Sequence, residues 1–349
     1  MTHLWVRAES RDHEARVGIM PQGVAQLIAA GFHVTVEDSP DRIVPTTDYA
    51  ATGADIAPAG GWTDAPDDAL IFGLKELPAD GSPLRHRHIM FGHAFKVQPD
   101  GLRLLDRFKA GGGTLLDLEY LTDDQNRRVA AFGYWAGYAG AAVSLMCWIA
   151  QQHGRDMGPI RAVPSAAHLL ADLQSDLVTL GTQRPTALII GAKGRVGTGA
   201  ADLCREMGVA TTRWDIEETA HGGPFPQVLT HDLFLNCILA RPGTPVFVPA
   251  SARTATRKLS VIGDIACDPD SDFSPIKVYD RVTTWDAPAL RVHDDPPLDV
   301  TAIDNLPSLM PLESSQDFAD QLLPHLAALP DSDVWARAAQ IFDRAISRR

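Results

Sequence analysis

The chain has 349 residues, 45% of them hydrophobic, which is enough for two domains that each bury an apolar core. Its formal net charge of −13 argues against a nucleic-acid-binding protein, because such proteins usually present a basic surface. The widely spaced cysteines form no CxxC pair, so neither a zinc site nor a disulfide framework is predicted. Reduced thiols and an N-terminus unlike a signal peptide indicate a cytoplasmic protein. The longest apolar stretch, 137–150, is too short to cross a membrane.

The first third of the chain alternates short apolar runs with helix-like segments. The helix expected over 21–30 starts with a proline and is followed by Gly31, which are common boundary signals. A second helix is expected over 102–109. Short apolar or alternating runs predict strands over 4–6, 32–37, 70–74, 88–91 and 114–119. This alternation predicts a mostly parallel sheet covered by helices.

The rest of the chain repeats this alternation after a long apolar segment, 133–152, that is rich in small residues and predicts a crossover helix. The second alternation starts at Thr186, with strand candidates over 232–237 and 259–264 and a loop-rich segment over 270–297. The tail, 314–349, contains two helix candidates that are expected to pack on the first domain.

The stretch 187–199 reads ALIIGAKGRVGTG and is the most informative in the chain. An apolar run ends in a cluster of glycines, and a helix is expected over 200–207. Glycines let a backbone approach a pyrophosphate, and the amides at a helix start face its charge. Asp215 stands about 24 residues after Gly191, where an acid typically meets the ribose hydroxyls of adenosine. The pattern predicts a βαβ unit that binds NAD rather than NADP, although Arg213 nearby weakens that preference.

Ionisable residues follow three consecutive predicted strands of the first domain. Lys75 follows the third strand, His93 follows the fourth, and Glu119 ends the fifth. Because the carboxyl ends of parallel strands share one edge of a sheet, these side chains are expected at one rim. Each alone is more often a solvent-exposed or structural residue, but together they suit acid–base catalysis. Arg16 and Arg128 are candidates to bind a dicarboxylate, with an ordinary surface arginine as the alternative for each.

Several motifs occur in the order of a known family. They are Arg7-Ala8-Glu9, Gly73-Leu74-Lys75-Glu76, Arg127-Arg128-Val129-Ala130-Ala131-Phe132-Gly133, Gly222-Gly223-Pro224-Phe225 and Leu306-Pro307-Ser308-Leu309. The chain resembles the NAD-dependent, lysine-forming saccharopine dehydrogenases over nearly its whole length. Alanine dehydrogenase and the soluble part of transhydrogenase look like more distant relatives with the same two-domain plan.

The resemblance implies an α/β fold with two Rossmann-like domains, mostly parallel sheets and an active-site cleft between the domains. Residues 1–132 and 305–349 would form the substrate and catalytic domain, and residues 133–304 the NAD-binding domain. The implied reaction is the reversible oxidative deamination of saccharopine to L-lysine and 2-oxoglutarate, in which hydride transfer to NAD precedes imine hydrolysis. A cytoplasmic monomer with small-molecule partners is expected, without metal, nucleic acid or membrane.

The resemblance also implies roles for individual residues. Lys75 would be the general base and His93 the general acid, with Glu76 and Glu119 tuning their proton affinity. Saccharopine would contact Arg16, Glu76, Gln98, Arg128, Phe132, Ala266, Cys267 and Asp268. NAD would contact Arg127, Gly194, Arg195, Asp215, Thr219, Leu239, Ile265, Ile303, Asp304, Asn305 and Leu306.

The chain departs from the family pattern in two places. Val196 stands where some members carry a cysteine that can pair with a partner matching Cys237, so Cys237 is expected to be a free thiol. The segment 264–268 matches only loosely and 270–295 diverges, which affects substrate contacts from the second domain. Two alternatives remain: an opine or amino-acid dehydrogenase with another oxo-acid and amine pair, and a non-catalytic NAD-binding regulatory module.

Overall fold

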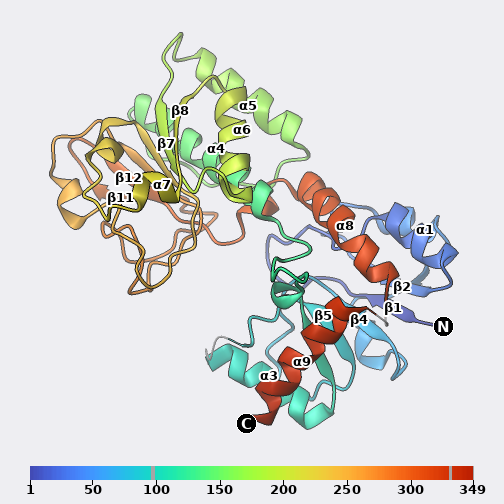
Figure 1. The fold of residues 1–349 in the computed structure, drawn as a ribbon. Helices are drawn as coiled ribbons and strands as arrows, with labels where there is room; N and C mark the ends of the chain where they lie inside the picture. Colours follow the sequence, from blue (N-terminus) through green and yellow to red (C-terminus); the bar gives the residue numbers. More distant parts are fainter. Residues whose placement is uncertain (96–98, 330–331, 349) are drawn as a thin grey trace. The chain divides into compact units, whose positions relative to one another are not determined.

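The computed structural model describes residues 1–95, 99–329 and 332–348. The chain folds into two compact units, which can be followed by colour in Figure 1. Unit 1 comprises Met1–Ala131 and Pro311–Arg349, and unit 2 comprises Phe132–Met310. The C-terminal helices therefore fold with the N-terminal part of the chain.

The described part of unit 1 contains a six-stranded parallel sheet in the order β3-β2-β1-β4-β5-β6. Its strands are short and, apart from the exposed edge strand β3, largely buried, as expected for a parallel sheet with both faces covered. They are β1 (His3–Val6), β2 (His33–Glu37), β3 (Asp55–Ala57), β4 (Leu70–Phe72), β5 (Arg87–Met90) and β6 (Thr114–Asp117).

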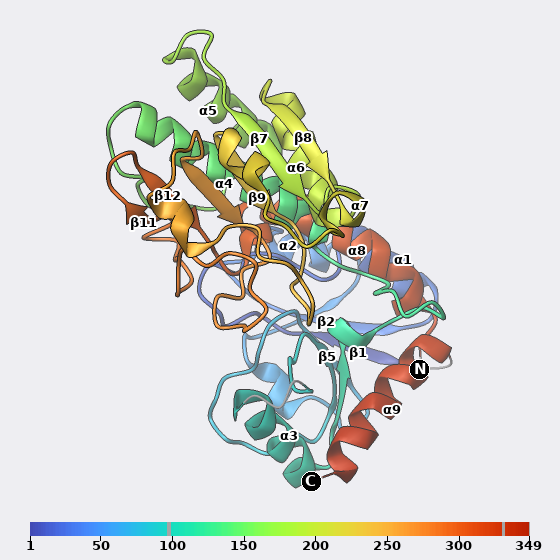
Figure 2. The same cartoon turned by 60° about the vertical axis from the view of Figure 1, so that its left-hand side comes forward.

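Helices from both ends of the chain cover this sheet. The N-terminal α1 (Pro21–Ala29) packs against the C-terminal α8 (Pro311–Ala327), and the two lie side by side in Figure 1. The last helix, α9 (Asp333–Ser347), packs against β6 and is seen beside the sheet in Figure 2. The remaining helices are α2 (Thr46–Ala50), α3 (Pro99–Gly111) and the 3₁₀ helices η1 (Gly61–Asp64) and η2 (Leu118–Tyr120).

Unit 2 contains a second six-stranded sheet, in the order β11-β12-β10-β9-β7-β8. Only the β11–β12 pair is antiparallel. The strands are β7 (Thr186–Ile190), β8 (Ala210–Trp214), β9 (Leu233–Asn236), β10 (Val261–Asp264), β11 (Leu290–His293) and β12 (Leu298–Thr301). The helices are α4 (Gly133–Gln152), α5 (Ala166–Val178), α6 (Arg195–Glu206) and α7 (Ile216–Thr219), with η3 (Pro226–Thr230), η4 (Ala250–Arg253) and η5 (Leu306–Leu309).

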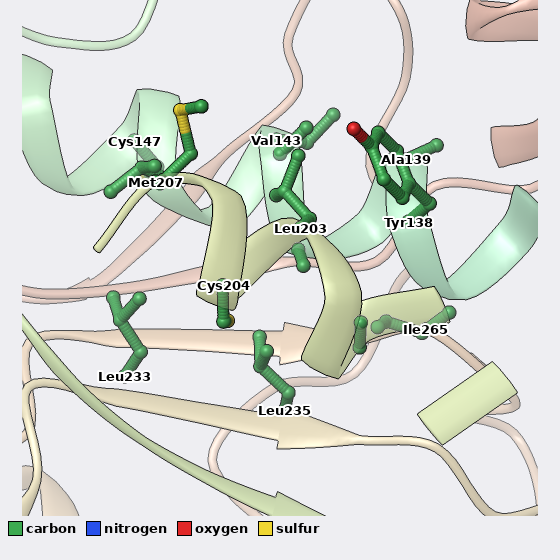
Figure 3. Packing of buried hydrophobic residues seen from close by; sticks show 14 of the residues in the cluster. Tyr138, Ala139, Val143, Cys147, Leu203, Cys204, Met207, Leu233, Leu235 and Ile265 are labelled. Atoms are coloured by element: carbon green, nitrogen blue, oxygen red, sulfur yellow. The ribbon is translucent and has the colours of Figure 1, made fainter. Parts of the chain in front are cut away.

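The core of unit 2 is built around a very close contact between α4 and α6. A Cβ atom at Gly137 would collide with the carbonyl of Val196, and one at Gly199 with the carbonyl of Tyr134. The two helices approach backbone to backbone at these glycines. Figure 3 shows α6 lying over the sheet, where Cys204 faces the side chains of β9. Burial raises the pKa of the Cys204 thiol to about 12, which keeps it protonated.

The helix after the glycine cluster starts earlier than the sequence predicts. It begins at Arg195 instead of residue 200, so Gly197 and Gly199 lie inside α6 and not in a loop. Glycine is a poor helix former, but a Cβ at Gly197 would collide with the carbonyl of Gly191. Close packing therefore decides these two positions.

The fifth strand predicted in unit 1 also ends earlier than expected. β6 stops at Asp117, and Glu119 lies in the 3₁₀ helix η2 that comes next. The Asp117 side chain accepts a hydrogen bond from the backbone N–H of Glu119, which starts this turn. Within the described ranges, no helix combines the length and the hydropathy that a membrane span requires.

Candidate functional site

In unit 1 the strand order reverses between β1 and β4, and ligands of doubly wound sheets bind at the carboxyl ends of the strands at such a point. Opposite charges from the end of β1 fill this position. The buried Arg7 guanidinium forms an ion pair with Glu9 at 3.2 Å and donates to the carbonyl of Lys75. The Glu9 carboxylate accepts from the amides of Leu74 at 2.6 Å and Lys75 at 3.0 Å. The backbone of Lys75 is thereby held from both of its peptide groups.

We call the contacts of Arg7 and Glu9 with the backbone of Lys75 the clamp. Gly73 leaves the space that the clamp requires. A Cβ atom at Gly73 would collide with the Arg7 guanidinium, so a larger residue would displace the arginine. The Arg-Ala-Glu and Gly-Leu-Lys-Glu motifs, which lie far apart in the sequence, are therefore parts of one structure. Sequence reasoning did not assign Arg7 and Glu9 a role. The available signal was a pair of opposite charges at the end of a buried strand.

The next two strands bring His93 and Glu119 together. The amide of Phe91 donates to the carbonyl of Leu74 at 3.0 Å, which ties the segment after β5 to the one after β4. His93 Nδ1 lies 2.9 Å from Glu119 Oε2, with His93 half exposed and Glu119 mostly covered. A carboxylate on Nδ1 fixes the imidazole orientation and leaves Nε2 for proton transfer. Three adjoining strand ends thus present Lys75, His93 and Glu119 at one edge of the sheet.

The other expected substrate residues of unit 1 have different surroundings. Arg16 is buried and forms a two-point contact with Glu14, with Nε–Oε1 at 2.8 Å and Nη2–Oε2 at 2.6 Å. Arg128 is exposed, and Glu76 is an exposed acid whose carboxylate lies 3.6 Å from the Arg11 guanidinium. Gln98 lies outside the described residues.

The strand order of unit 2 reverses between β7 and β9, and the glycine cluster lies at this point. Gly191 adopts a left-handed φ of 87°, and its amide donates to the carbonyl of Trp214 at 2.9 Å. Gly194 is the N-cap of α6; no side chain caps the helix and no acid lies in its first turn. A helix start with neither a capping side chain nor an acid is one at which a pyrophosphate can bind favourably.

Asp215 directly follows β8, is the N-cap of α7 and organises the same edge. Its carboxylate accepts from the amides of Lys193 and Ile216, both at 2.9 Å, and its own amide donates to Glu218 at 2.7 Å. Thr219 donates to the carbonyl of Asp215 at 3.0 Å. Asp215 thus links the glycine loop to α7, at the position where the ribose hydroxyls of a nucleotide are expected.

The remaining expected cofactor residues are spread over unit 2. Leu239 is exposed after β9, Ile265 is buried after β10, and Arg195 is exposed at the start of α6. Ile303 and Leu306 belong to the apolar core, whereas Asp304 is exposed and Asn305 has a left-handed φ of 69°. Arg127 instead belongs to unit 1, where it forms an ion pair with Asp123 at 2.9 Å.

The expected substrate residues of unit 2 lie at the start of α4 and directly after β10. Phe132 is the N-cap of α4, while Ala266, Cys267 and Asp268 follow β10. Just before them, Asp264 accepts from Asn236 Nδ2 at 2.9 Å and from Tyr279 Oη at 2.6 Å. Burial raises the pKa of Asp264. These contacts anchor the strand end from which the three residues extend.

Two further observations concern cysteines and metals. Cys237 is a free, buried thiol, as expected from Val196. No group of His, Cys, Asp or Glu side chains in the described ranges is arranged to hold a metal ion.

Comparison with curated proteins identifies the family. The chain is 43% identical over 360 residues to a saccharopine dehydrogenase (NAD(+), L-lysine-forming) of Yarrowia lipolytica, covering 99% of this chain and 98% of that protein. It is 41% identical over 363 residues to the protein of the same name from Schizosaccharomyces pombe, covering 99% of both. The chain belongs to the saccharopine dehydrogenase family. The resemblance inferred from the sequence motifs is confirmed.

More distant likenesses place this saccharopine dehydrogenase family member in a wider fold group. Residues 5–139 match the family model named alanine dehydrogenase/PNT, N-terminal domain. An L-alanine dehydrogenase structure superposes with a TM-score of 0.70 at 19% identity, covering 98% of this chain and 94% of that chain. A transhydrogenase from Sinorhizobium meliloti gives 0.64 at 15% identity, covering 96% and 97%. These structures confirm the predicted α/β fold with mostly parallel, Rossmann-like sheets.

Proposed function

We propose that this chain catalyses the reversible, NAD-dependent oxidation of saccharopine to L-lysine and 2-oxoglutarate. One observation carries the proposal. Three adjoining strand ends present Lys75, His93 and Glu119 in a chain that matches saccharopine dehydrogenases over nearly its whole length. The fold alone supports no particular substrate, because one fold serves many reactions.

The proposed chemistry uses Lys75 and His93 to move protons. NAD, when bound, supplies the hydride acceptor for the carbon beside the secondary amine of saccharopine. Lys75 accepts the amine proton, so that the substrate becomes an imine. His93, oriented by Glu119 on Nδ1, takes a proton from the water that attacks the imine carbon. The imine keeps one proton on its nitrogen, so the attack gives a neutral carbinolamine. His93 then returns its proton to the nitrogen, the C–N bond breaks, and the hydroxyl proton passes to the departing lysine amine, which leaves protonated as 2-oxoglutarate forms.

Binding roles in the proposal follow the family resemblance. Arg16, Arg128 and Gln98 hold substrate carboxyl and polar groups, with Glu76, Phe132, Ala266, Cys267 and Asp268 as further contacts. For the cofactor, the uncapped start of α6 suits the pyrophosphate and Asp215 suits the ribose hydroxyls. The carboxylate of Asp215 disfavours a 2′-phosphate, so NAD is the proposed cofactor. We further propose that the enzyme acts as a cytoplasmic monomer in lysine biosynthesis.

A substrate panel tests the proposal. NADH oxidation is followed at neutral pH with lysine and 2-oxoglutarate, then with pyruvate or glyoxylate and with other amines, and the product is identified by mass spectrometry. The expected result is fastest turnover with lysine and 2-oxoglutarate and formation of saccharopine. Faster turnover of another pair would instead identify an opine or amino-acid dehydrogenase. NADH binding without turnover across the panel would identify a regulatory module.

A further inference from the structure

Asp117 is a fully buried acid at the end of β6 that the proposed reaction does not use. Its Oδ1 accepts from the amide of Glu119 at 2.9 Å, whereas its Oδ2 is buried against the backbone of Gly92 and makes no hydrogen bond of ordinary geometry. Helix α9 packs on β6, but its Arg337 donates to Thr122 and Asp124 instead. A buried carboxylate oxygen without a well-formed hydrogen bond is costly, so its retention calls for a reason beyond packing.

The turn that carries His93 is built against this carboxyl. Met90 of β5 is in register with Asp117, and a Cβ atom at Gly92 would lie 3.4 Å from Asp117 Oδ2 and 2.6 Å from Leu115 Cδ2. Position 92 therefore has no room for a side chain. His93 comes next with a left-handed φ of 48°, a conformation that costs free energy for a residue other than glycine. Such a conformation persists only where its surroundings fix it, and Asp117 is part of those surroundings.

The three ionisable groups of this region influence one another. Burial raises the pKa of Asp117 to about 6, and the negative charge of Glu119 acts in the same direction. The amide of Glu119, the charge of a protonated His93 and the amide of Gly92 act in the opposite direction. Because these groups interact, each apparent pKa that a titration measures belongs to the group as a whole and not to one residue.

We propose that Asp117 is a positioning residue that holds the His93–Glu119 pair in its working geometry and couples the charge of His93 to a third, buried carboxyl. Its Oδ1 fixes the Glu119 backbone, and its Oδ2 lies behind the Gly92–His93 turn. When His93 gains a proton, the negative charge of Asp117 stabilises the imidazolium. The catalytic meaning of this coupling rests on the proposed function, in which His93 takes a proton from the attacking water.

The decisive experiment is an NMR titration of the His93 imidazole, assigned with a His93→Gln variant. In Asp117→Asn the amide oxygen still accepts from Glu119 while the charge is lost. The midpoint of the His93 titration is expected to move to lower pH by about one unit. The acid limb of the kcat/KM profile for saccharopine moves in the same direction, and kcat falls about tenfold. KM for NAD stays unchanged.

Asp343→Asn is the matched control, because Asp343 is an exposed acid on α9 of the same unit. It is expected to leave both the titration and the pH profile as they are. A second measurement needs no Asp117 variant. In the unaltered protein, the carboxyl carbon of Asp117, followed by ¹³C NMR, is expected to titrate above the ordinary range of an aspartate, and in His93→Gln it is expected to titrate at still higher pH, because the charge of a protonated His93 lowers the Asp117 pKa.

An unmoved His93 midpoint in Asp117→Asn would overturn the proposal, as would an Asp117 titration that is the same in the unaltered protein and in His93→Gln. Failure of the proposed function is a separate result. An unaltered protein that does not turn over saccharopine would leave the imidazole titration as a valid test of Asp117.

Discussion

Both units reverse their strand order, but charged side chains lie at the reversal point of unit 1 and glycines at that of unit 2. In unit 1, between β1 and β4, the buried charges of Arg7 and Glu9 grip the backbone of Lys75. In unit 2, between β7 and β9, the glycine loop leads to Gly194, the N-cap of α6, and Gly197 has no room for a side chain against Gly191. One arrangement fixes the backbone at Lys75, the proposed general base, whereas the other places a helix start where we propose that the pyrophosphate binds. Similar sheets thus support different tasks through the residues that come directly after their strands.

The largest expected effect tests whether Lys75, whose backbone is held by Arg7 and Glu9, is the general base. Lys75→Met is expected to lower kcat for saccharopine oxidation by roughly 10²–10⁴, because a positioned acid–base group is lost. Steady-state kinetics measure the change. Lys109→Met, an exposed lysine at the end of α3, serves as the control and is expected to be neutral. Nearly full turnover by Lys75→Met would show that Lys75 is not the general base.

The clamp itself can be loosened without touching a charge. Gly73→Ala places a Cβ atom into the Arg7 guanidinium, so the Lys75 backbone shifts and kcat is expected to fall by roughly 10². KM for NAD is expected to stay constant, because the substitution lies in unit 1. Gly61→Ala is the matched control, since its Cβ would meet only ordinary contacts, the nearest at 3.4 Å. Unchanged kcat in Gly73→Ala would rule out a positioning role for Arg7.

The burial of His88 in unit 1 makes the free energy of unfolding depend on pH. Burial lowers the pKa of His88 to about 3, with the nearby Arg7 charge acting in the same direction. The unfolded chain binds a proton near pH 6.5 that the folded chain does not, so stability is lost as the pH falls from there toward 3. His88→Phe is expected to keep about 2 kcal/mol of unfolding free energy that the unaltered protein loses between pH 7 and 5.

Urea unfolding at pH 5, 7 and 8 measures this difference. The two proteins are expected to change in parallel between pH 7 and 8, where His88 is neutral in both states. Parallel loss of stability down to pH 5 would contradict the assignment and point to other buried groups.

The smallest effect tests the glycine side of the comparison. Asp215→Asn removes the carboxylate proposed to bind the ribose, so kcat/KM for NAD is expected to fall about tenfold. The value for NADP is expected to fall less or to rise, because repulsion of the 2′-phosphate is gone and Arg213 is close in sequence. Steady-state kinetics with both cofactors give the ratio. An unchanged NAD/NADP ratio would show that Asp215 serves only to hold the loop at Lys193.

The sequence by itself determined the features that depend on local signals. Apolar runs, a proline at the start of α1 and the small residues of α4 predicted most elements and the α/β class. The glycine cluster with Asp215, and the motifs around Lys75 and Arg128, predicted the family. These signals lie within short stretches, because strand and helix periodicity and turn geometry are properties of neighbouring residues.

The tertiary structure decided the features that depend on residues that meet only after folding. Gly199 inside α6 is explained by its contact with α4, and the contacts that hold the backbone of Lys75 are explained by charges that follow β1. Neither contact can be read from spacing, because each joins segments that are far apart in the sequence. The burial that raises the pKa of Asp117 likewise results from packing over the whole unit.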